Sequence, residues 1–171
     1  MRRARLPLAL ACAAALAALP ASLSAAGTAP GCRPGNLSAS FVEVPGSAGA
    51  GHISYAVRIR NHDRPCTISG RPGLQLLGKG GHALPTHTVP DHPGTGTAVL
   101  VTIRYNHTAR ADARFSPDIP GPGEGDPCEG TAYTVRVTLP SPAAGVVRGP
   151  VKPPTAVCEH GRIVLGLLHG G

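Results

Sequence analysis

Histidines recur at every fifth position in one stretch of the chain, a spacing that raises the question of metal binding. The three are His82, His87 and His92, and Asp91 precedes the last of them. Neutral imidazoles and a carboxylate are ligands for Zn²⁺ or Cu²⁺. Two prolines interrupt the stretch and prevent a helix from aligning the rings, so a loop would have to fold around the ion. An exposed polar loop is the simpler interpretation, and we expect no bound metal and no cofactor.

A second group of ionisable residues forms an acidic segment later in the chain. Its carboxylate oxygens could bind calcium, but they lack the every-second-residue ligand spacing of a calcium loop, so a solvated loop is favoured. The four residues are Asp118, Glu124, Asp126 and Glu129.

Motifs for nucleophilic catalysis are missing from the sequence. Neither the nucleophile elbow G-x-S-x-G nor the motif S-x-x-K is present. Ser47 in PGSAG comes nearest, but its glycines have the wrong spacing. We therefore expect no enzyme activity and no catalytic residues. A metal-dependent enzyme that uses the histidine loop remains an alternative.

Arginines recur at polar positions of the expected strands. They could form a cationic sheet surface for anionic envelope polymers or for a partner protein, although ordinary solubilising arginines are the simpler interpretation. These residues are Arg58, Arg60, Arg104, Arg110, Arg114 and Arg136.

Four cysteines outside the leader predict two disulfides: Cys32, Cys66, Cys128 and Cys158. A zinc site needs closely spaced pairs, and here the nearest two cysteines are 30 residues apart. Four cysteines allow three connectivities. Pairing in sequence order, Cys32 with Cys66 and Cys128 with Cys158, is preferred. In the chain-entropy treatment each such bridge would stabilise the fold by about 3–4 kcal/mol.

The first residues have the pattern of a secretory signal peptide. Arginines precede a run of Ala and Leu over residues 8–19, and small residues up to Ala26 suit cleavage there. The run is too short to span a bilayer, which takes about 20 apolar residues. Cys12 lies in the middle of the run, so lipidation is not expected. We predict a signal peptide over 1–26 and a secreted or extracytoplasmic location in the cell envelope.

The length and net charge of residues 27–171 limit the kinds of domain and partner that we expect. Residues 27–171 suffice for a single β-sandwich domain, with its core over 32–168. Of 16 Lys and Arg residues three lie in the leader, which leaves 13 against 9 Asp and Glu. These charges form no basic block, so we expect no nucleic-acid partner. We also expect no membrane span and a monomeric protein.

Short strands are expected to position these residues. Apolar and polar residues alternate most clearly over 52–60 and 132–139, where Tyr133, Val135 and Val137 share a face. Alanines at alternate positions of 109–115 are expected to point inward. Residues 85–96 and 117–127 are expected to be loops, and the proline-rich 140–154 to be irregular with a short edge strand at 146–147.

Seven to nine such strands with turn signals between them indicate an all-β fold. We expect an antiparallel immunoglobulin-like β-sandwich held by disulfides. The chain has no Trp, so the Cys–Trp–Cys core of true immunoglobulin domains is absent.

Three spaced elements carry a family resemblance: Cys32, then YAVRIRN ending at Asn61, then CTISGRPGL beginning at Cys66. With the alanine-rich strand ending at Phe115 and the later cysteine pair, the chain resembles the actinobacterial exported family DUF4232. The chain departs from the family pattern in two places. Residues 105–108, Tyr-Asn-His-Thr, replace the Pro-Gly turn that commonly precedes the alanine-rich strand, and Phe115 replaces Trp at the end of that strand. The resemblance implies a secreted or envelope sandwich without an assigned activity.

Together these observations predict a non-enzymatic binding or interaction module outside the cytoplasmic membrane. Its partner would be a protein or an envelope polymer. The loops His82 to Gly96 and Asp118 to Asp126 would make most of the contacts with this partner. An extracellular protease inhibitor or ligand-capture protein, with a proline-stiffened loop, is a further alternative.

Overall fold

The structure, a computed structural model, describes residues 29–49, 51–94, 96–128 and 130–171. The expected signal peptide, Cys12 and Glu129 lie outside the described residues. The described part forms eleven strands and three short 3-10 turns. None of its helices is long and apolar enough to cross a membrane.

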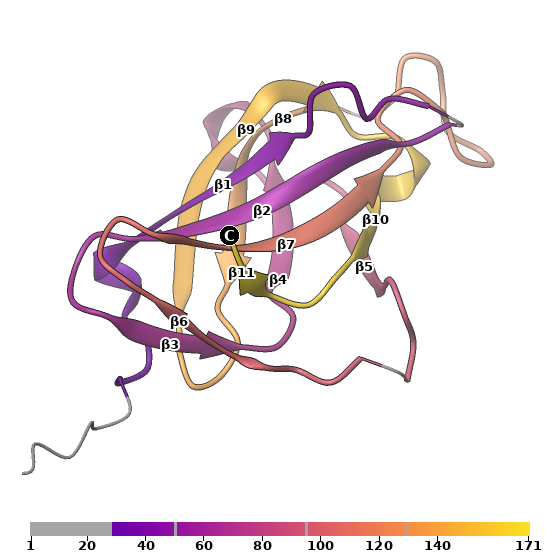
Figure 1. The fold of residues 1–171 in the computed structure, drawn as a ribbon. Coiled ribbons are helices and arrows are strands. Elements are labelled where there is room, and N and C mark those ends of the chain that lie inside the picture. Colours follow the sequence, from indigo (N-terminus) through magenta and orange to yellow (C-terminus); the bar gives the residue numbers. More distant parts are fainter. Residues whose placement is uncertain (1–28, 50, 95, 129) are drawn as a thin grey trace, which may run out of the picture.

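Nine of the strands belong to one sheet (Figure 1). Across the sheet they run in the order β4 (Gly73–Leu77), β8 (Thr131–Thr138), β9 (Val146–Ala156), β1 (Leu37–Glu43), β2 (Ile53–Asn61), β7 (Thr108–Phe115), β10 (Arg162–Leu165) and β5 (His87–Pro90). The short β11 (His169–Gly170) also pairs with β7. Two further strands, β3 (Cys66–Ser69) and β6 (Leu100–Ile103), form a separate antiparallel pair.

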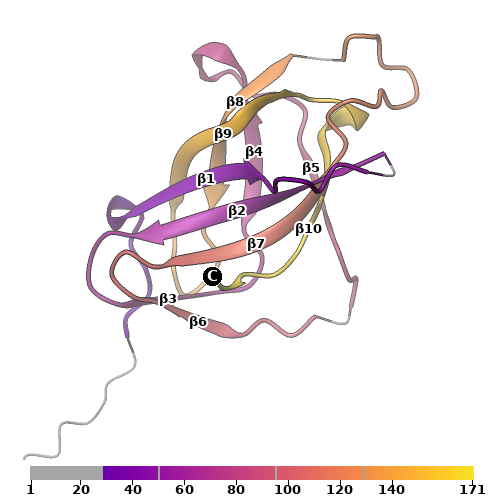
Figure 2. The ribbon, with the colours of Figure 1, turned by 45° about the horizontal axis from the view of Figure 1, so that its top comes forward.

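The large sheet curls, so that it makes two layers around one core. Strands β1, β2, β7 and β10 form the front layer in Figure 1, and β4, β8 and β9 lie behind them, as the turned view in Figure 2 also shows. The β3–β6 pair lies across the lower end in Figure 1 and contributes Ile68 and Ile103 to the core.

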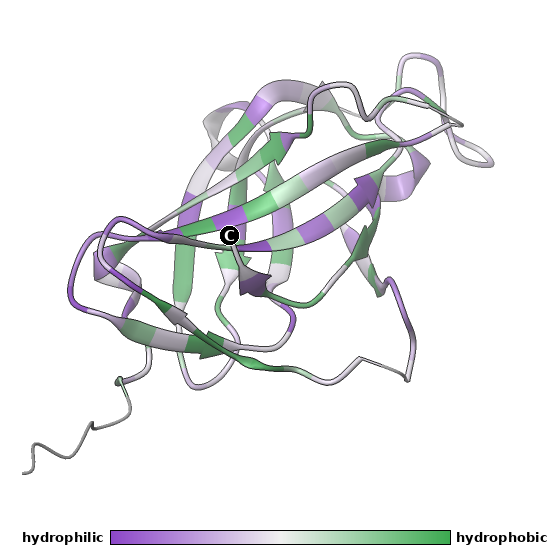
Figure 3. Cartoon of the chain, viewed as in Figure 1, coloured by the Kyte–Doolittle hydropathy of each residue, from purple (hydrophilic) through white to green (hydrophobic). Residues whose placement is uncertain are grey.

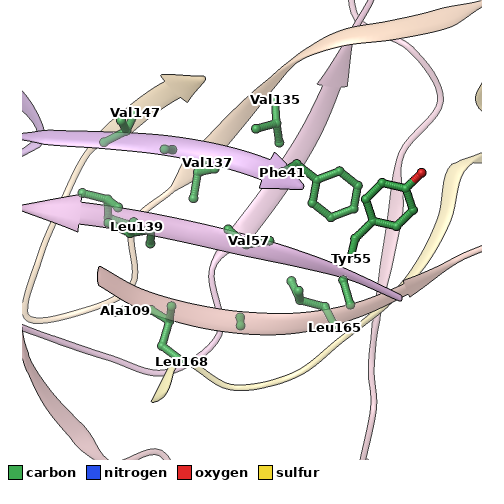
Figure 4. Packing of buried hydrophobic residues seen from close by; sticks show 14 of the residues in the cluster. Phe41, Tyr55, Val57, Ala109, Val135, Val137, Leu139, Val147, Leu165 and Leu168 are labelled. Carbon is green, nitrogen blue, oxygen red and sulfur yellow. The ribbon is translucent and has the colours of Figure 1, made fainter. Parts of the chain in front are cut away.

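Three aromatic rings form the centre of the core. Phe41 stacks on Tyr55 with ring centroids 4.7 Å apart, and Tyr55 meets Phe115 edge-on at 5.9 Å. Valines of β8, including Val135 and Val137, approach these rings from the other layer (Figure 4). The inward residues of β7 before Phe115 are small alanines, which leaves space for the large rings.

The sequence alternation is confirmed in β2 and β7. Tyr55, Val57 and Ile59 of β2 are buried, and so are the three alanines of β7, while the arginines between them face outward.

Both disulfides are present, and their pairing follows sequence order. Cys32 is bonded to Cys66, with 4.8 Å between their Cα atoms, and Cys128 to Cys158, with 5.2 Å. The first bridge ties the N-terminal segment to β3, where the backbone N–H of Cys32 also donates to the carbonyl of Thr67. The all-β, disulfide-bonded part of the fold prediction is thus confirmed.

The purely antiparallel arrangement was wrong, because two strand pairs of the large sheet are parallel. β1 runs parallel to β9, and β10 runs parallel to β5. Alternation along a strand reports which face is buried but carries no information on the direction of the neighbouring strand. The result is a curled mixed sheet.

Residues 140–154, which we expected to be irregular apart from a short edge strand at 146–147, differ most from expectation. Residues 146–156 instead form β9, an eleven-residue strand between β8 and β1. Proline cannot donate to a ladder, and this strand contains Pro150, Pro153 and Pro154. Pro153 and Pro154 are tolerated because they pair in register with neither β8 nor β1, and Pro150, opposite Thr134, directly precedes the register shift between β8 and β9.

Two further segments differ from expectation. Residues 87–90, placed in a loop by their prolines, form the edge strand β5 because β10 supplies a parallel partner. Tyr133 shares no face with the valines of β8. A register shift between Ala132 and Thr134 turns Tyr133 outward, where 44% of it is exposed, and Ala132 is buried instead.

A buried asparagine fixes the turn that leads into the first disulfide. Asn61, at the end of β2, is 1% exposed. Its Nδ2 donates to the carbonyls of Arg64 and Ile103, and its Oδ1 accepts from the backbone N–H of Asp63. One side chain therefore binds a buried backbone carbonyl of β6 and partly buried backbone groups of the turn.

Gly149 permits the close approach of β9 to β1. A Cβ atom at this position would lie 1.6 Å from the carbonyl oxygen of Ala39, a separation that no backbone adjustment of a few tenths of an ångström can relieve. The junction between the two layers therefore depends on the absence of a side chain at residue 149.

We predict that Gly149→Ala lowers the free energy of unfolding by about 3 kcal/mol or more, because the methyl group forces β9 away from β1. The control is Gly35→Ala, whose Cβ meets nothing within 4 Å. Chemical denaturation of the oxidised proteins measures both. Equal stability of the two variants would contradict the described junction.

Candidate functional site

Four arginines meet on the outer surface of the front layer. Arg58 of β2 lies directly opposite Arg110 of β7, and Arg60 and Arg114 extend the group along the same two strands. We call these four residues the arginine face. Hydrophilic bands alternate with paler ones along β2 and β7 in Figure 3, as expected for strands with one face in the core.

One carboxylate stands among these arginines. Asp112 of β7 accepts a hydrogen bond from Arg110 Nη2, and its Oδ2 lies 3.3 Å from His169 Nε2. Burial acts to raise the pKa of Asp112, but the hydrogen bond and charge of Arg110 outweigh it and hold the pKa below its ordinary value. This carboxylate is therefore already compensated by cations of the protein.

Three members of the arginine face have no such compensation. Among the described residues, no carboxylate forms an ion pair with Arg58, Arg60 or Arg114. The front surface of β2 and β7 thus carries an excess of positive charge at fixed positions.

The other two arginines expected to join this surface do not. Arg104 is exposed in the turn between β6 and β7. Arg136 lies on β8, opposite Arg148 of β9. Because β8 and β2 turn their apolar side chains into the same core from opposite sides, Arg136 points away from the arginine face.

A groove of about 550 Å³ adjoins the arginine face, between β7 and the residues that follow β5. The short side chains of Ser54, Ala113 and Val164 leave this space open beside the longer side chains of Arg110 and Arg114. The lining residues are Val44, Ser54, Asp91, His92, Arg110, Asp112, Ala113, Arg114 and Val164.

Asp91 forms the far wall of the groove. It lies 3.5 Å from Arg71 Nη2 and 3.1 Å from His92 Nδ1. Burial acts to raise its pKa, but hydrogen bonds from His92 and the nearby cations keep the pKa of Asp91 below its ordinary value. A Cβ at Gly166 would lie 3.3 Å from Asp91 Oδ2, so this glycine allows the carboxylate to approach β7.

The histidines of the proposed metal loop are not brought together. The Nδ1 of His82 contacts the carbonyl of Lys79, His87 begins β5, and His92 pairs with Asp91. Within the described ranges, no three His, Cys, Asp or Glu side chains meet as a metal site would require. The metal-dependent enzyme thus remains a prediction without an ion-holding geometry in this part of the chain.

Glu124 of the acidic segment is an internal anchor and not a free ligand. Its side chain is inaccessible to solvent. The carboxylate accepts backbone N–H groups from Gly121 of its own loop and from Glu159 and His160 of the turn η3 (Glu159–Gly161). Burial acts to raise the pKa of Glu124, but these donors outweigh it and hold the pKa below its ordinary value.

Sequence reasoning missed Arg71 and Gly166 as parts of this region. The Nε of Arg71 donates to the carbonyl of Leu165, and its guanidinium pairs with Asp91. Both contacts join segments far apart in the chain, so local spacing could not reveal them. The alternation of short and long polar residues in HISYAVRIR was the available signal for the groove.

We predict that Glu124→Gln destabilises the protein and that the loss depends on pH. The unfolded chain has the higher pKa, so it binds more protons in acid. The advantage of the wild type is therefore present above the ordinary glutamate pKa and disappears as the pH falls through the lower folded value. Thermal unfolding at about pH 7 and about pH 3 measures it.

Asp126→Asn is the matched control for this prediction, because Asp126 is an exposed carboxylate of the same loop. It should leave the unfolding temperature nearly unchanged at both pH values. A Glu124→Gln variant whose stability deficit stays the same in acid would contradict the anchoring role of the carboxylate.

Comparison with known proteins agrees with the family resemblance that the sequence shows, including the segment CTISGRPGL that begins at Cys66. The sequence matches the family described as Domain of unknown function (DUF4232) over residues 32–167. No curated protein and no solved structure matches the chain. The matched range includes both disulfides, the arginine face and the lining of the groove. The chain therefore belongs to the DUF4232 family.

Proposed function

We propose that this chain is an exported, non-enzymatic binding module of the cell envelope or extracellular space, and that its arginine face binds an anionic polymer. The observation that carries the proposal is the positive charge of Arg58, Arg60 and Arg114, which form no ion pair among the described residues, on one face of the paired strands β2 and β7.

The spacing of these charges suits a repeating ligand. Outward positions along a strand recur at roughly 6.5–7 Å, and adjacent strands lie about 4.8 Å apart. Guanidinium groups bind carboxylates and phosphates through two parallel hydrogen bonds. A chain of regularly placed anions can therefore meet several arginines at once, and each additional contact is intramolecular after the first.

The rigidity of the surface supports the same proposal. β2 lies between β1 and β7, so its backbone is paired on both sides. Binding on such strands orders only side chains and leaves the backbone as it was, which reduces the entropic cost of association. The disulfides are compatible with an oxidising compartment outside the cytoplasm, where envelope polymers occur.

The test is retention on polygalacturonate, dextran sulfate and neutral dextran. We expect the protein to bind the two acidic polymers at low ionic strength, to be released as NaCl rises from about 0.05 M to about 0.5 M, and to ignore neutral dextran. The double variant Arg58→Gln/Arg60→Gln should lose about tenfold in affinity, since each surface ion pair contributes about 0.5–1 kcal/mol.

The matched control is Arg136→Gln/Arg148→Gln, which removes the same charge from the opposite layer. It should bind nearly as well as the wild type. Equal losses in both double variants would show that net charge alone drives adsorption, and would contradict the proposal, as would a failure to bind either acidic polymer.

One observation favours the alternative of a protease inhibitor or ligand-capture protein. The proline-rich loop after β7 is held at its far end by the Glu124 carboxylate and by the Cys128–Cys158 bridge, while Ile119 remains 47% exposed. A stiff loop with an exposed apolar residue can enter a protease cleft. Stoichiometric inhibition of a serine protease, abolished by Ile119→Asp, would favour this alternative over polymer binding.

A further inference from the structure

The groove beside the arginine face is lined by carboxylates, a serine hydroxyl and valines as well as by arginines. We propose that it binds one acidic sugar unit, a hydroxylated ring bearing a carboxylate or a phosphate, with Arg114 as the ligand of the anionic group. This inference rests on the proposed function, because the sugar unit would belong to the polymer that the arginine face binds.

Arg114 is the cation of the groove that is free to bind an external anion. Arg110 already pairs with Asp112 and Arg71 with Asp91, and the rings of His169 and His92 lie beside the same two carboxylates. Among the described residues no carboxylate pairs with Arg114. Its exposed side chain lines both the 550 Å³ groove and a second hollow of about 270 Å³ beside it, so a ligand can reach it from either side.

The remaining polar groups of the groove suit hydroxyl groups. Asp91 and Asp112 are compensated in charge, yet each carboxylate has lone pairs beyond those used by its protein partners, and these can accept sugar hydroxyls. Ser54 adds a hydroxyl on the side of β2. A bare inorganic anion would leave these acceptors unused. The arrangement therefore favours a ligand that combines one anion with several donors.

The shape of the groove agrees with a ligand of this size. Ligand sites commonly have volumes of about 300–1,000 Å³, a range that includes 550 Å³. Val44 and Val164 place small apolar surfaces in the lining, against which the C–H groups of a sugar ring can pack. Ser54, Ala113 and Val164 are short side chains between long ones, so the space exists without any rearrangement of the strands.

The test uses monomeric sugars, which cannot span the arginine face. Galacturonate, glucose 6-phosphate, inorganic phosphate and neutral galactose are titrated separately into the oxidised protein, and backbone amide shifts are followed by NMR. We expect galacturonate or glucose 6-phosphate to shift amides at residues 54, 112–114 and 164–166, with galactose ineffective. Preference between the two acids identifies the anion as carboxylate or phosphate.

Arg114→Gln should weaken this binding at least tenfold, whereas Arg136→Gln on the opposite layer should leave it unchanged. Ser54→Leu, which fills the groove without removing charge, should also abolish it. Thermal unfolding of each variant establishes that it is folded.

The outcomes separate this inference from the proposed function. If acidic polymers bind but Arg114→Gln loses no more affinity than Arg136→Gln, and acidic monosaccharides shift no groove amides, the groove inference is overturned and the polymer-binding proposal stands. Inorganic phosphate binding as tightly as glucose 6-phosphate would also overturn it, because the sugar would contribute nothing. If no acidic polymer binds, the proposed function itself fails.

Discussion

The parallel contact between β1 and β9 is the interaction on which the rest of the structure depends. It is short, involving only Phe41 with Val151 and Val42 with Lys152. Yet it joins β4, β8 and β9 to the other strands, so that one sheet curls into two layers. Gly149 makes this approach possible, because any side chain there would collide with the backbone of β1. Once the layers are joined, their apolar faces share one core, and polar residues on alternate positions are directed outward on opposite sides of the molecule.

The distribution of charge follows from that geometry. Arginines of β2 and β7 gather on the front layer, while Arg136 and Arg148 are carried to the back. A modest net charge, spread evenly along the sequence, thereby becomes locally concentrated at a rigid surface. The disulfides have a different role, since each fixes a segment that contributes little to the sheet. Cys32–Cys66 holds the N-terminal segment to β3, and Cys128–Cys158 holds the base of the acidic loop, with Glu124 as a noncovalent partner to the same turn.

Much of the front layer could be predicted from the sequence, because apolar and polar residues alternate along β7 and along β2 except at the buried Ala56, and this alternation indicates which face is buried. The same reasoning underestimated β9, whose three prolines suggested irregular chain beyond a short strand at 146–147, since Pro153 and Pro154 lie where the strand has no register partner. It failed for Tyr133 because a bulge inverts the alternation partway along β8. In the candidate site, the arginines were visible as a pattern. The roles of Arg71, Gly166 and Glu124 were not, since each depends on contacts between distant segments.

β9 joins the two layers into one sheet by running beside β1, and backbone nuclear Overhauser contacts in the oxidised protein can test this arrangement. The structure predicts contacts between amide and α protons of Phe41 or Val42 and those of Val151 or Lys152, in the pattern of parallel strands. Contacts from β9 to β8 alone, with none to β1, would contradict the account, because the two layers would then be separate sheets.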